Sequence, residues 1–380
     1  MECVYAKRIF TGKSVIENGF LLFSQGKVVG FATAPRGKLL GKFPVLTPAF
    51  IDPHSHIGMV RAGEPGSESE SNDHLDAILV LPDALDSIQM DDAAFAEAVE
   101  DGVLYSCVLP GSGNIVGGLS AVVRHYARNT SEALVARAGV KAAFGYNPMS
   151  AQSWKGTRPT TRMGAMALLR KRFDDVREKM EKRRRARGKK KEEIVFGAEE
   201  AALRDLLEGK TRLRAHVHKS DDIAMLLRLV DQYKIRVSVE HAMDVNAPET
   251  FRELRRRRIP VTYGPLDAFA YKVELKHAAW RNVRFLLESG VAFGLMTDHP
   301  VTASRSLLLQ TRWLLRAGLT KQQAIEIVSR RNAEILGIDH LLGTLANGKW
   351  ASFTCWSGDP FDLASRPVAV YGEGRRLFAE

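Results

Sequence analysis

The segment FIDPHSHIGM at residues 50–59 contains two histidines, His54 and His56, separated by one serine. It overlaps the end of an apolar run, VLTPAFI at residues 45–51, which is typical of a buried strand. Because side chains i and i+2 of a strand lie on the same face, both imidazoles are predicted to project together from the strand end. Two imidazoles do not complete the coordination sphere of a metal ion, so further ligands would have to come from elsewhere in the chain.

Three other candidate ligands stand at the ends of short apolar runs. His216 ends LRAH, His241 ends VSVEH and Asp298 ends FGLMTD. The carboxyl ends of parallel strands in one barrel meet at one mouth, so these side chains are expected to converge with the first two histidines. Histidine nitrogens with one carboxylate suit zinc or another borderline divalent ion. His218 shares the strand face of His216 and could be the ligand in its place.

Eight apolar runs are predicted to be strands, and helical patterns such as DDIAMLLRLVDQYK at residues 221–234 separate most of them. This alternation predicts an α/β fold, a (β/α)8 TIM barrel, with its active site at the carboxyl-terminal strand ends. The predicted strands are residues 48–55, 103–109, 119–126, 138–145, 212–217, 235–240, 259–263 and 291–297.

The sequence pattern at the two ends of the chain differs from that of the middle, because glycine-containing breaks separate short apolar runs there. This pattern predicts hairpins rather than strand–helix units. We therefore expect residues 1–47 and 345–380 to form one strand-rich domain and residues 48–344 to form the barrel.

The chain has 380 residues and a formal net charge of +11. Much of the excess lies in RKRFDDVREKMEKRRRARGKKKEE at residues 170–193, and a second basic run is RELRRRR at residues 252–258. Aromatic residues do not alternate with these bases, so we expect weak, salt-sensitive adhesion to polyanions and no specific nucleic-acid binding. The purely basic segment 182–191 is predicted to be exposed and to take no part in the chemistry, because burying its charge would be costly.

The composition also bears on where the protein works. There is no run of about 18 apolar residues, so no membrane span is expected, and the first ten residues lack the apolar core of a signal peptide. Cys3, Cys107 and Cys355 lie far apart and form no CxxC pattern. A reducing, cytoplasmic location is predicted.

Taken together, these motifs resemble the amidohydrolase superfamily of metal-dependent hydrolases, in which an HxH pair is followed by two histidines and an aspartate at later strand ends. The segments that resemble a branch related to imidazolonepropionases include TPAFIDPHSHIG at 47–58, TDHPV at 297–301 and LGTLANGKWASFTCWSGDPFD at 342–362. The resemblance covers nearly the whole chain. It implies a TIM barrel with a small β-sandwich built from both termini.

The resemblance also implies roles for the candidate ligands. His54, His56 and His216 would hold a divalent metal, and His216 is favoured over His218 because the family's ligand directly follows the apolar strand. Asp298 would bind the metal or accept a proton from its water. His241 would bind a second metal or lie beside the reacting carbonyl group. Zinc is the first choice of metal, with iron or manganese as alternatives.

The number of metals is predicted from a difference between this chain and the relatives that it resembles. Relatives in this branch supply an anionic bridge between two metals, whereas this chain has Tyr146 and Arg124 at the matching positions. A guanidinium has no lone pair to offer, and a phenol with a pKa near 10 is a poor anionic ligand. Lys141 lies about 16 Å along the strand from Tyr146. One tightly held metal per chain is therefore expected, on His54, His56, His216 and Asp298.

The predicted function is hydrolysis of a C–N bond in an amide or cyclic amide of a small molecule (EC 3.5). The alternatives are a deaminase of an aminated heterocycle and an inactive barrel that serves as a binding or scaffold protein. A homo-oligomer is compatible with the sequence. The candidate substrate-binding residues are Tyr146, Arg162, Arg124, Lys219 and His218.

Overall fold

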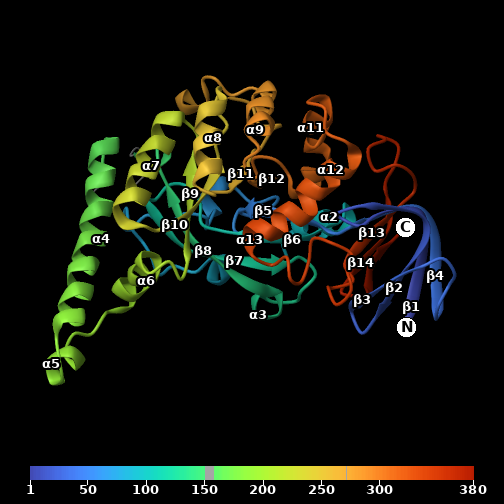
Figure 1. The fold of residues 1–380 in the computed structure, drawn as a ribbon, viewed down its shortest axis with the longest axis horizontal. Coiled ribbons are helices and arrows are strands. Elements are labelled where there is room, and N and C mark those ends of the chain that lie inside the picture. The colour runs from blue at the N-terminus through green and yellow to red at the C-terminus, as the bar shows by residue number, and fades with distance from the viewer. Residues whose placement is uncertain (150–157, 271) are drawn as a thin grey trace.

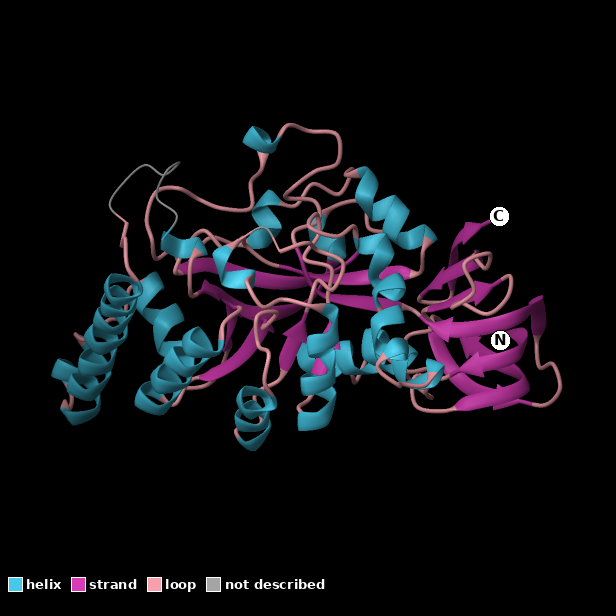
Figure 2. Ribbon diagram, turned by 90° about the horizontal axis from the view of Figure 1, so that it is seen from above, coloured by secondary structure: helices cyan, strands magenta, loops and turns pink. Residues whose placement is uncertain are grey.

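The computed structural model describes residues 1–149, 158–270 and 272–380, and these form two sheets with helices packed around one of them (Figure 1). Eight strands from the middle of the chain form a nearly closed barrel, and seven strands from both ends form a second sheet beside it (Figure 2). The prediction of a TIM barrel flanked by a sheet domain from both termini is confirmed.

The barrel strands follow one another in chain order around the sheet. The last strand contacts the first, and the closure is completed where Asp52 accepts a hydrogen bond from the backbone N–H of Thr297 at 3.2 Å. The strands are β5 (Phe50–Ser55), β6 (Val103–Val108), β7 (Val116–Arg124), β8 (Leu134–Ala143), β9 (Arg212–Val217), β10 (Arg236–His241), β11 (Val261–Tyr263) and β12 (Phe293–Leu295).

One strand runs against the others. β7 pairs antiparallel with both β6 and β8, because residues 109–115 form a short loop that turns the chain back instead of a helical crossover. The expectation that residues 119–126 form a parallel strand ending at the mouth was therefore wrong in direction. The carboxyl end of β7 lies at the opposite end of the barrel, where Arg124 is the register partner of Tyr105.

Helices cover the outside of the barrel and bury apolar faces against it. α7 shows the pattern, because Ile223, Leu226 and Leu229 are buried along one side while Arg228 and Asp231 are exposed on the other. The longer helices are α2 (Ala93–Glu100), α4 (Arg162–Arg185), α6 (Ala198–Leu207), α7 (Ser220–Tyr233), α8 (Pro248–Arg256) and α9 (Val283–Ser289). Shorter ones are α1 (Ala84–Ser87), α3 (Thr130–Ala133), α5 (Lys189–Glu192), α10 (Leu307–Gln310), α11 (Arg312–Arg316), α12 (Lys321–Glu326) and α13 (Asn332–Leu336).

The terminal sheet encloses a core of its own, in which the rings of Phe23, Phe353 and Tyr371 pack together. A bridge between Lys27 and Trp350 brings its edge strand back towards the C-terminal segment. The strands are β1 (Glu2–Phe10), β2 (Val15–Ser24), β3 (Lys27–Ala32), β4 (Lys38–Pro48), β13 (Phe353–Trp356), β14 (Pro367–Gly372) and β15 (Arg375–Ala379).

The barrel interior carries charge, whereas aliphatic side chains usually fill such barrels. Arg214 is only 1% exposed, and its guanidinium donates to the carbonyl of Pro53 at 2.7 Å and to Glu240 at 3.1 Å. Lys141 is also fully buried and donates to the carbonyl of Pro110 at 2.9 Å. These charges are paired or hydrogen-bonded, which is the condition under which a core tolerates them.

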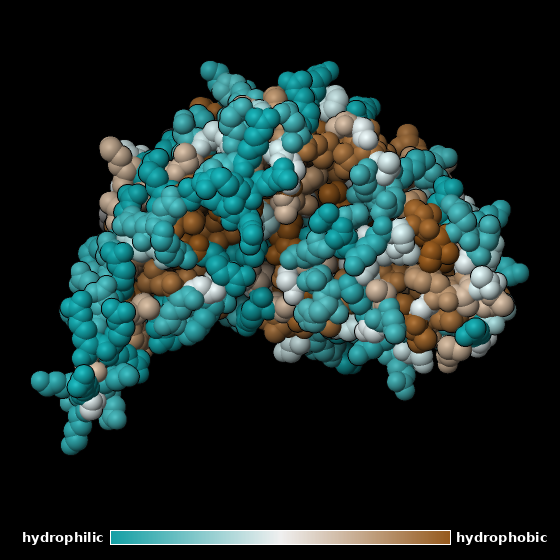
Figure 3. Space-filling model, in the orientation of Figure 1, coloured by the Kyte–Doolittle hydropathy of each residue, from teal (hydrophilic) through white to brown (hydrophobic). Residues whose placement is uncertain are grey.

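α4 and α5 form an arm that projects from the body (Figures 1 and 3). The buried side chains of α4 lie between Ala165 and Val176, and the last turns are exposed and hydrophilic. The predicted exposure of segment 182–191 is thus observed. None of the helices in the described ranges is long and apolar enough to cross a membrane.

Candidate metal centre

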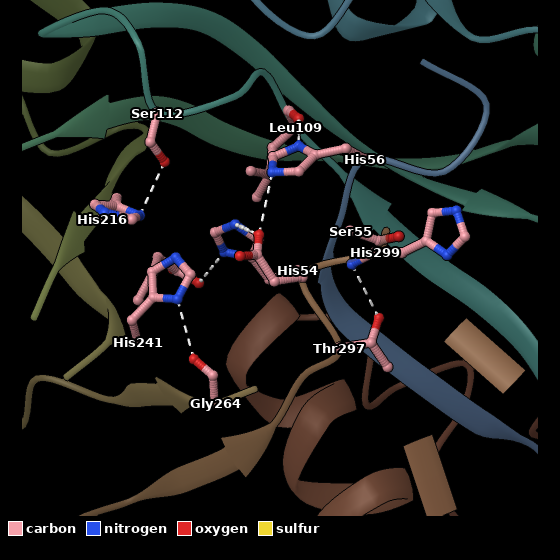
Figure 4. Close-up of polar contacts among 12 residues, drawn as sticks. His54, Ser55, His56, Leu109, Ser112, His216, His241, Gly264, Thr297 and His299 are labelled. Carbon is pink, nitrogen blue, oxygen red and sulfur yellow. Dashed lines mark hydrogen bonds and ion pairs between the residues drawn. The ribbon is translucent and has the colours of Figure 1, made fainter. Parts of the chain in front are cut away.

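The predicted ligands meet at the carboxyl-terminal end of the barrel. His54 and His56 lie at the end of β5, His216 near the end of β9 and His241 at the end of β10, and the four rings surround one space (Figure 4). Asp298 follows β12 and places Oδ1 at 3.1 Å from Nε2 of His56 and at 3.4 Å from Nε2 of His54. The alternation of apolar strands with helices was sufficient to predict this convergence.

The Nδ1 atom of each of these four histidines faces an oxygen. The partners are Glu240 for His54 at 3.1 Å, the carbonyl of Leu109 for His56 at 2.7 Å, Ser112 Oγ for His216 at 2.8 Å, and the carbonyl of Gly264 for His241 at 3.0 Å. Carbonyl and carboxylate oxygens only accept, so Nδ1 must carry the proton in His54, His56 and His241. The lone pair then lies on Nε2, which is the arrangement found in metal-binding histidines.

The donor atoms fall into two overlapping groups. Within each group, the ligand atoms lie within 4.8 Å of one another: His54, His241 and Asp298 form one group, and His216, His218 and His241 form the other. Among the described residues, Nε2 of His54 and of His241 and both nitrogens of His218 are buried without a hydrogen-bond partner. Buried nitrogens left open beside a carboxylate fit a divalent cation.

The protonation states favour metal binding. Burial is the main cause that lowers the pKa of His216 and His241 well below the usual value, and it lowers the pKa of His218 to about 4. These rings are therefore neutral at pH 7 and their lone pairs are available. Burial acts to raise the pKa of Asp298, but the imidazoles of His241, His54 and His56 beside the carboxylate hold that pKa well below its usual value.

Backbone strain is concentrated at the same place. His241, Ala242 and Asp298 have φ values of 78°, 55° and 51°, in the left-handed region that residues other than glycine seldom adopt. Such strain is frequent at functional sites, where it aims side chains that a relaxed backbone would turn away.

A buried carboxylate that the sequence did not reveal lies on the far side of the histidines. The Glu274 side chain is 1% exposed, and its Oε1 lies 3.7 Å from Nε2 of His216 and 3.9 Å from Nε2 of His218. Lys272 Nζ donates to it at 3.2 Å, and the backbone N–H of Tyr146 donates to its other oxygen at 3.0 Å. Glu274 belongs to the irregular connection after β11, where no periodic pattern marks a functional residue.

Lys141 is closer to the site than its distance along the strand from Tyr146 suggested. Its side chain lies inside the barrel, and burial lowers its pKa to about 8 while the charges of Asp298 and Glu240 act in the opposite direction. A lysine with this pKa is partly unprotonated near neutral pH.

The predicted substrate-binding residues are divided between the two ends of the barrel. Arg162 pairs with Asp222 through contacts of 2.6 and 3.1 Å beside Lys219, and Tyr146 is 49% exposed at the rim. His218 faces the histidine cluster. Arg124, by contrast, is not at the mouth, because β7 is antiparallel; it stacks over Trp350 and lies 3.4 Å from Glu373.

Comparisons with known proteins agree with this architecture. The model of the amidohydrolase family matches residues 45–375. The amidohydrolase tasK of Hapsidospora irregularis is 24% identical over an alignment of 355 positions that covers 88% of this chain and 36% of that relative, so the chain spans about a third of the relative's length. A crystal structure of an amidohydrolase from Thermotoga maritima is 30% identical over the whole of both chains, with a TM-score of 0.92.

More distant structures share the fold alone. Ochratoxinase from A. niger is 15% identical, with a TM-score of 0.60 over all of this chain and 96% of that one. Guanine deaminase from E. coli is 15% identical, with a TM-score of 0.55 over all of both chains. The family match over most of the length, together with the strand-end histidines and aspartate, places the chain in the amidohydrolase family.

Proposed function

We propose that this protein is a metal-dependent hydrolase that cleaves a C–N bond in an amide or cyclic amide. The observation that carries the proposal is the set of four histidines whose Nδ1 atoms face oxygens. Nε2 of His54 and of His56 lies 3.4 and 3.1 Å from Asp298, and the ligand atoms of His54 and His241 lie within 4.8 Å of that carboxylate. A barrel kept only for binding or as a scaffold would not need buried, unpartnered nitrogens around a carboxylate.

His54, His56, His216 and Asp298 are the proposed ligands of one tightly held divalent ion. His241 can join them, because its ligand atom lies within 4.8 Å of those of His54 and Asp298. When bound, the ion supplies hydroxide at neutral pH and polarises the substrate carbonyl. Zinc is the first choice because imidazole nitrogens and one carboxylate are the ligands it prefers.

Asp298 is the proposed proton carrier. Its carboxylate lies between two histidine nitrogens and is ionised at neutral pH, so it can accept a proton from the attacking water and later give it to the leaving nitrogen. His241 is a ligand or a base rather than a hydrogen-bond donor to the carbonyl, because Gly264 fixes its proton on Nδ1. Tyr146, Arg162, Lys219 and His218 are proposed to contact the substrate.

We also propose that the chain divides into one domain of residues 1–47 and 345–380 and a catalytic domain of residues 48–344. The three cysteines are buried and unpaired, which is compatible with a reducing compartment such as the cytoplasm.

Metal content is the first test. Protein reconstituted with zinc, manganese or iron should retain close to one tightly bound ion per chain after extensive dialysis, measured by elemental analysis. A value below about 0.1 per chain would contradict the proposal. The loaded protein should then be screened against N-acyl amino acids, dipeptides, hydantoin-like rings and aminated heterocycles. Ammonia release from the heterocycles alone would favour a deaminase.

A further inference from the structure

The positive charge of this protein is concentrated at the tip of its arm. Residues 182–191 contain eight lysines and arginines and no acid, so the rest of the chain accounts for only +3 of the net charge of +11. The run spans the last turn of α4, a turn around Gly188 and most of α5, and all of it lies at the projecting end (Figures 1 and 3). Seven of the eight cations have no ion pair with any described residue, and Arg185 lies 3.5 Å from Glu181.

The second basic run shows that this chain can neutralise such charges. In residues 252–258, Arg256 pairs with Glu253 at 2.6 Å, and Arg257 contacts both Glu253 and Asp231 at 2.5 Å. Arg255 donates to the carbonyl of Ser289 at 3.0 Å. That run serves the packing of α8 against its neighbours, whereas at the tip of the arm Arg185 alone has an ion-pair partner among the described residues.

The fold adds an aromatic ring that the sequence pattern did not place there. Phe196 lies between α5 and α6, and Arg183, Arg204 and Lys179 stand 5.7, 5.1 and 5.4 Å from its ring centre. A hollow of about 520 Å³ opens here, with Met180 and Phe196 as its apolar lining. Its charged lining consists of Arg177, Arg183, Arg184, Lys191 and Arg204, with Glu181 and Glu208.

We infer that the tip of the arm is a binding site for single-stranded nucleic acid, engaged through its phosphates and without sequence preference. Arginine forks match phosphate oxygens, and a cationic groove beside an aromatic ring is the usual construction for single strands. The cationic stretch is short, because acids return in α4 before Lys182, so a flexible strand can follow it better than a duplex. A lipid surface is a poorer partner, because Val195 is the only large apolar side chain strongly exposed among residues 182–196 and offers little to insert.

The experiment measures the binding of the full-length protein to a fluorescein-labelled 20-nucleotide oligothymidylate by anisotropy at several salt concentrations. The test variant is Arg183→Gln/Arg184→Gln/Lys190→Gln/Lys191→Gln. We expect a micromolar Kd at low salt and at least tenfold weaker binding for the variant. The slope of log K against log salt should become shallower by about 2 to 3, because each phosphate contact on a single strand contributes about 0.7.

A matched control removes four exposed cations from the terminal sheet and its β3–β4 loop instead, by Lys7→Gln/Arg36→Gln/Lys38→Gln/Lys42→Gln. The control should bind like the wild type, and both variants should keep their metal content and melting temperature. Equal losses in both variants would show a general charge effect and overturn the inference. So would unchanged binding in the test variant, tighter binding to phosphatidylserine vesicles, or equally strong binding to polyglutamate.

Discussion

The two ends of the barrel differ in how their buried polar atoms are hydrogen-bonded. At the carboxyl-terminal end, buried nitrogens of His54, His218 and His241 lack partners among the described residues, and the backbone at His241 and Asp298 is strained. At the amino-terminal end, the hydroxyl of Tyr105 bonds to both Tyr126 and Ser352 at 2.8 Å. The first end keeps open bonding capacity for a ligand, whereas at the second the buried Tyr105 hydroxyl is fully bonded, in part to Ser352 beside the terminal sheet. Function and stability can therefore be disturbed separately.

The largest effect is expected at Asp298. Asp298→Asn keeps the shape but removes the proton acceptor, so kcat of the loaded enzyme should fall by about 10²–10⁴-fold. Steady-state kinetics on a substrate found by the screen would measure this. Asp244→Asn is the matched control, because this buried carboxylate bonds to His277 rather than to the four histidines. A variant at Asp298 that retained more than a tenth of kcat would contradict the assigned role.

The next effect concerns the support of His54. Glu240 accepts hydrogen bonds from Arg214 and from His54, each at 3.1 Å. Burial opposes its ionisation, but Arg214 and His54 lower the pKa of Glu240 to about 2. Glu240→Gln should weaken metal affinity by about 10–100-fold, because His54 loses the carboxylate that holds its tautomer. Competition with a chelator would report the affinity.

The same variant leaves Arg214 buried without its counter-ion, which destabilises the fold. The double variant Arg214→Met/Glu240→Gln removes that cost and should remain weak in metal binding. Recovery of wild-type affinity in the double variant would show that Glu240 serves only to neutralise Arg214.

A smaller effect is expected at the amino-terminal end. Tyr105→Phe removes a buried hydroxyl that joins Tyr126 to Ser352, so the free energy of unfolding should fall by about 1–2 kcal/mol. Urea unfolding would measure the change, and metal content should stay the same. Loss of metal in this variant would mean that the two ends are coupled.

The smallest effect is a pH dependence. Burial lowers the pKa of His125, away from the metal centre, to about 3. The unfolded chain therefore binds the proton first as pH falls below about 6.5, and the folded state loses stability. Between pH 6.5 and 5.5, His125→Gln should flatten the decline in unfolding free energy of metal-free protein by about 1 kcal/mol. An unchanged slope would show that His125 does not contribute.

The parts of the site that lie on regular strands could be predicted from the sequence. His54, His56, His216, His241 and Asp298 each end an apolar run, and topology brings such ends together. The direction of β7 could not be predicted, because parallel and antiparallel strands share one local pattern. Glu274 was missed because it lies in an irregular connection.

The aromatic partner of the basic tip was missed for a related reason. Phe196 comes 13 residues after Arg183, and only the packing of α4 against α6 brings their side chains together. Contacts that depend on the relative placement of two elements leave no periodic signal in either of them.

The oxygen partners of the four Nδ1 atoms have a consequence for how the protein would acquire its metal. They come from Glu240 on a strand, from Ser112 and from two main-chain carbonyls, so the protein's own hydrogen bonds fix the orientation of the rings. The coordination cage is therefore preorganised, and loading should demand little rearrangement. A zinc finger folds around its ion, whereas this barrel would bind and exchange metal when it is already folded. The ion it carries in a cell would then reflect which metals are abundant there when the protein matures.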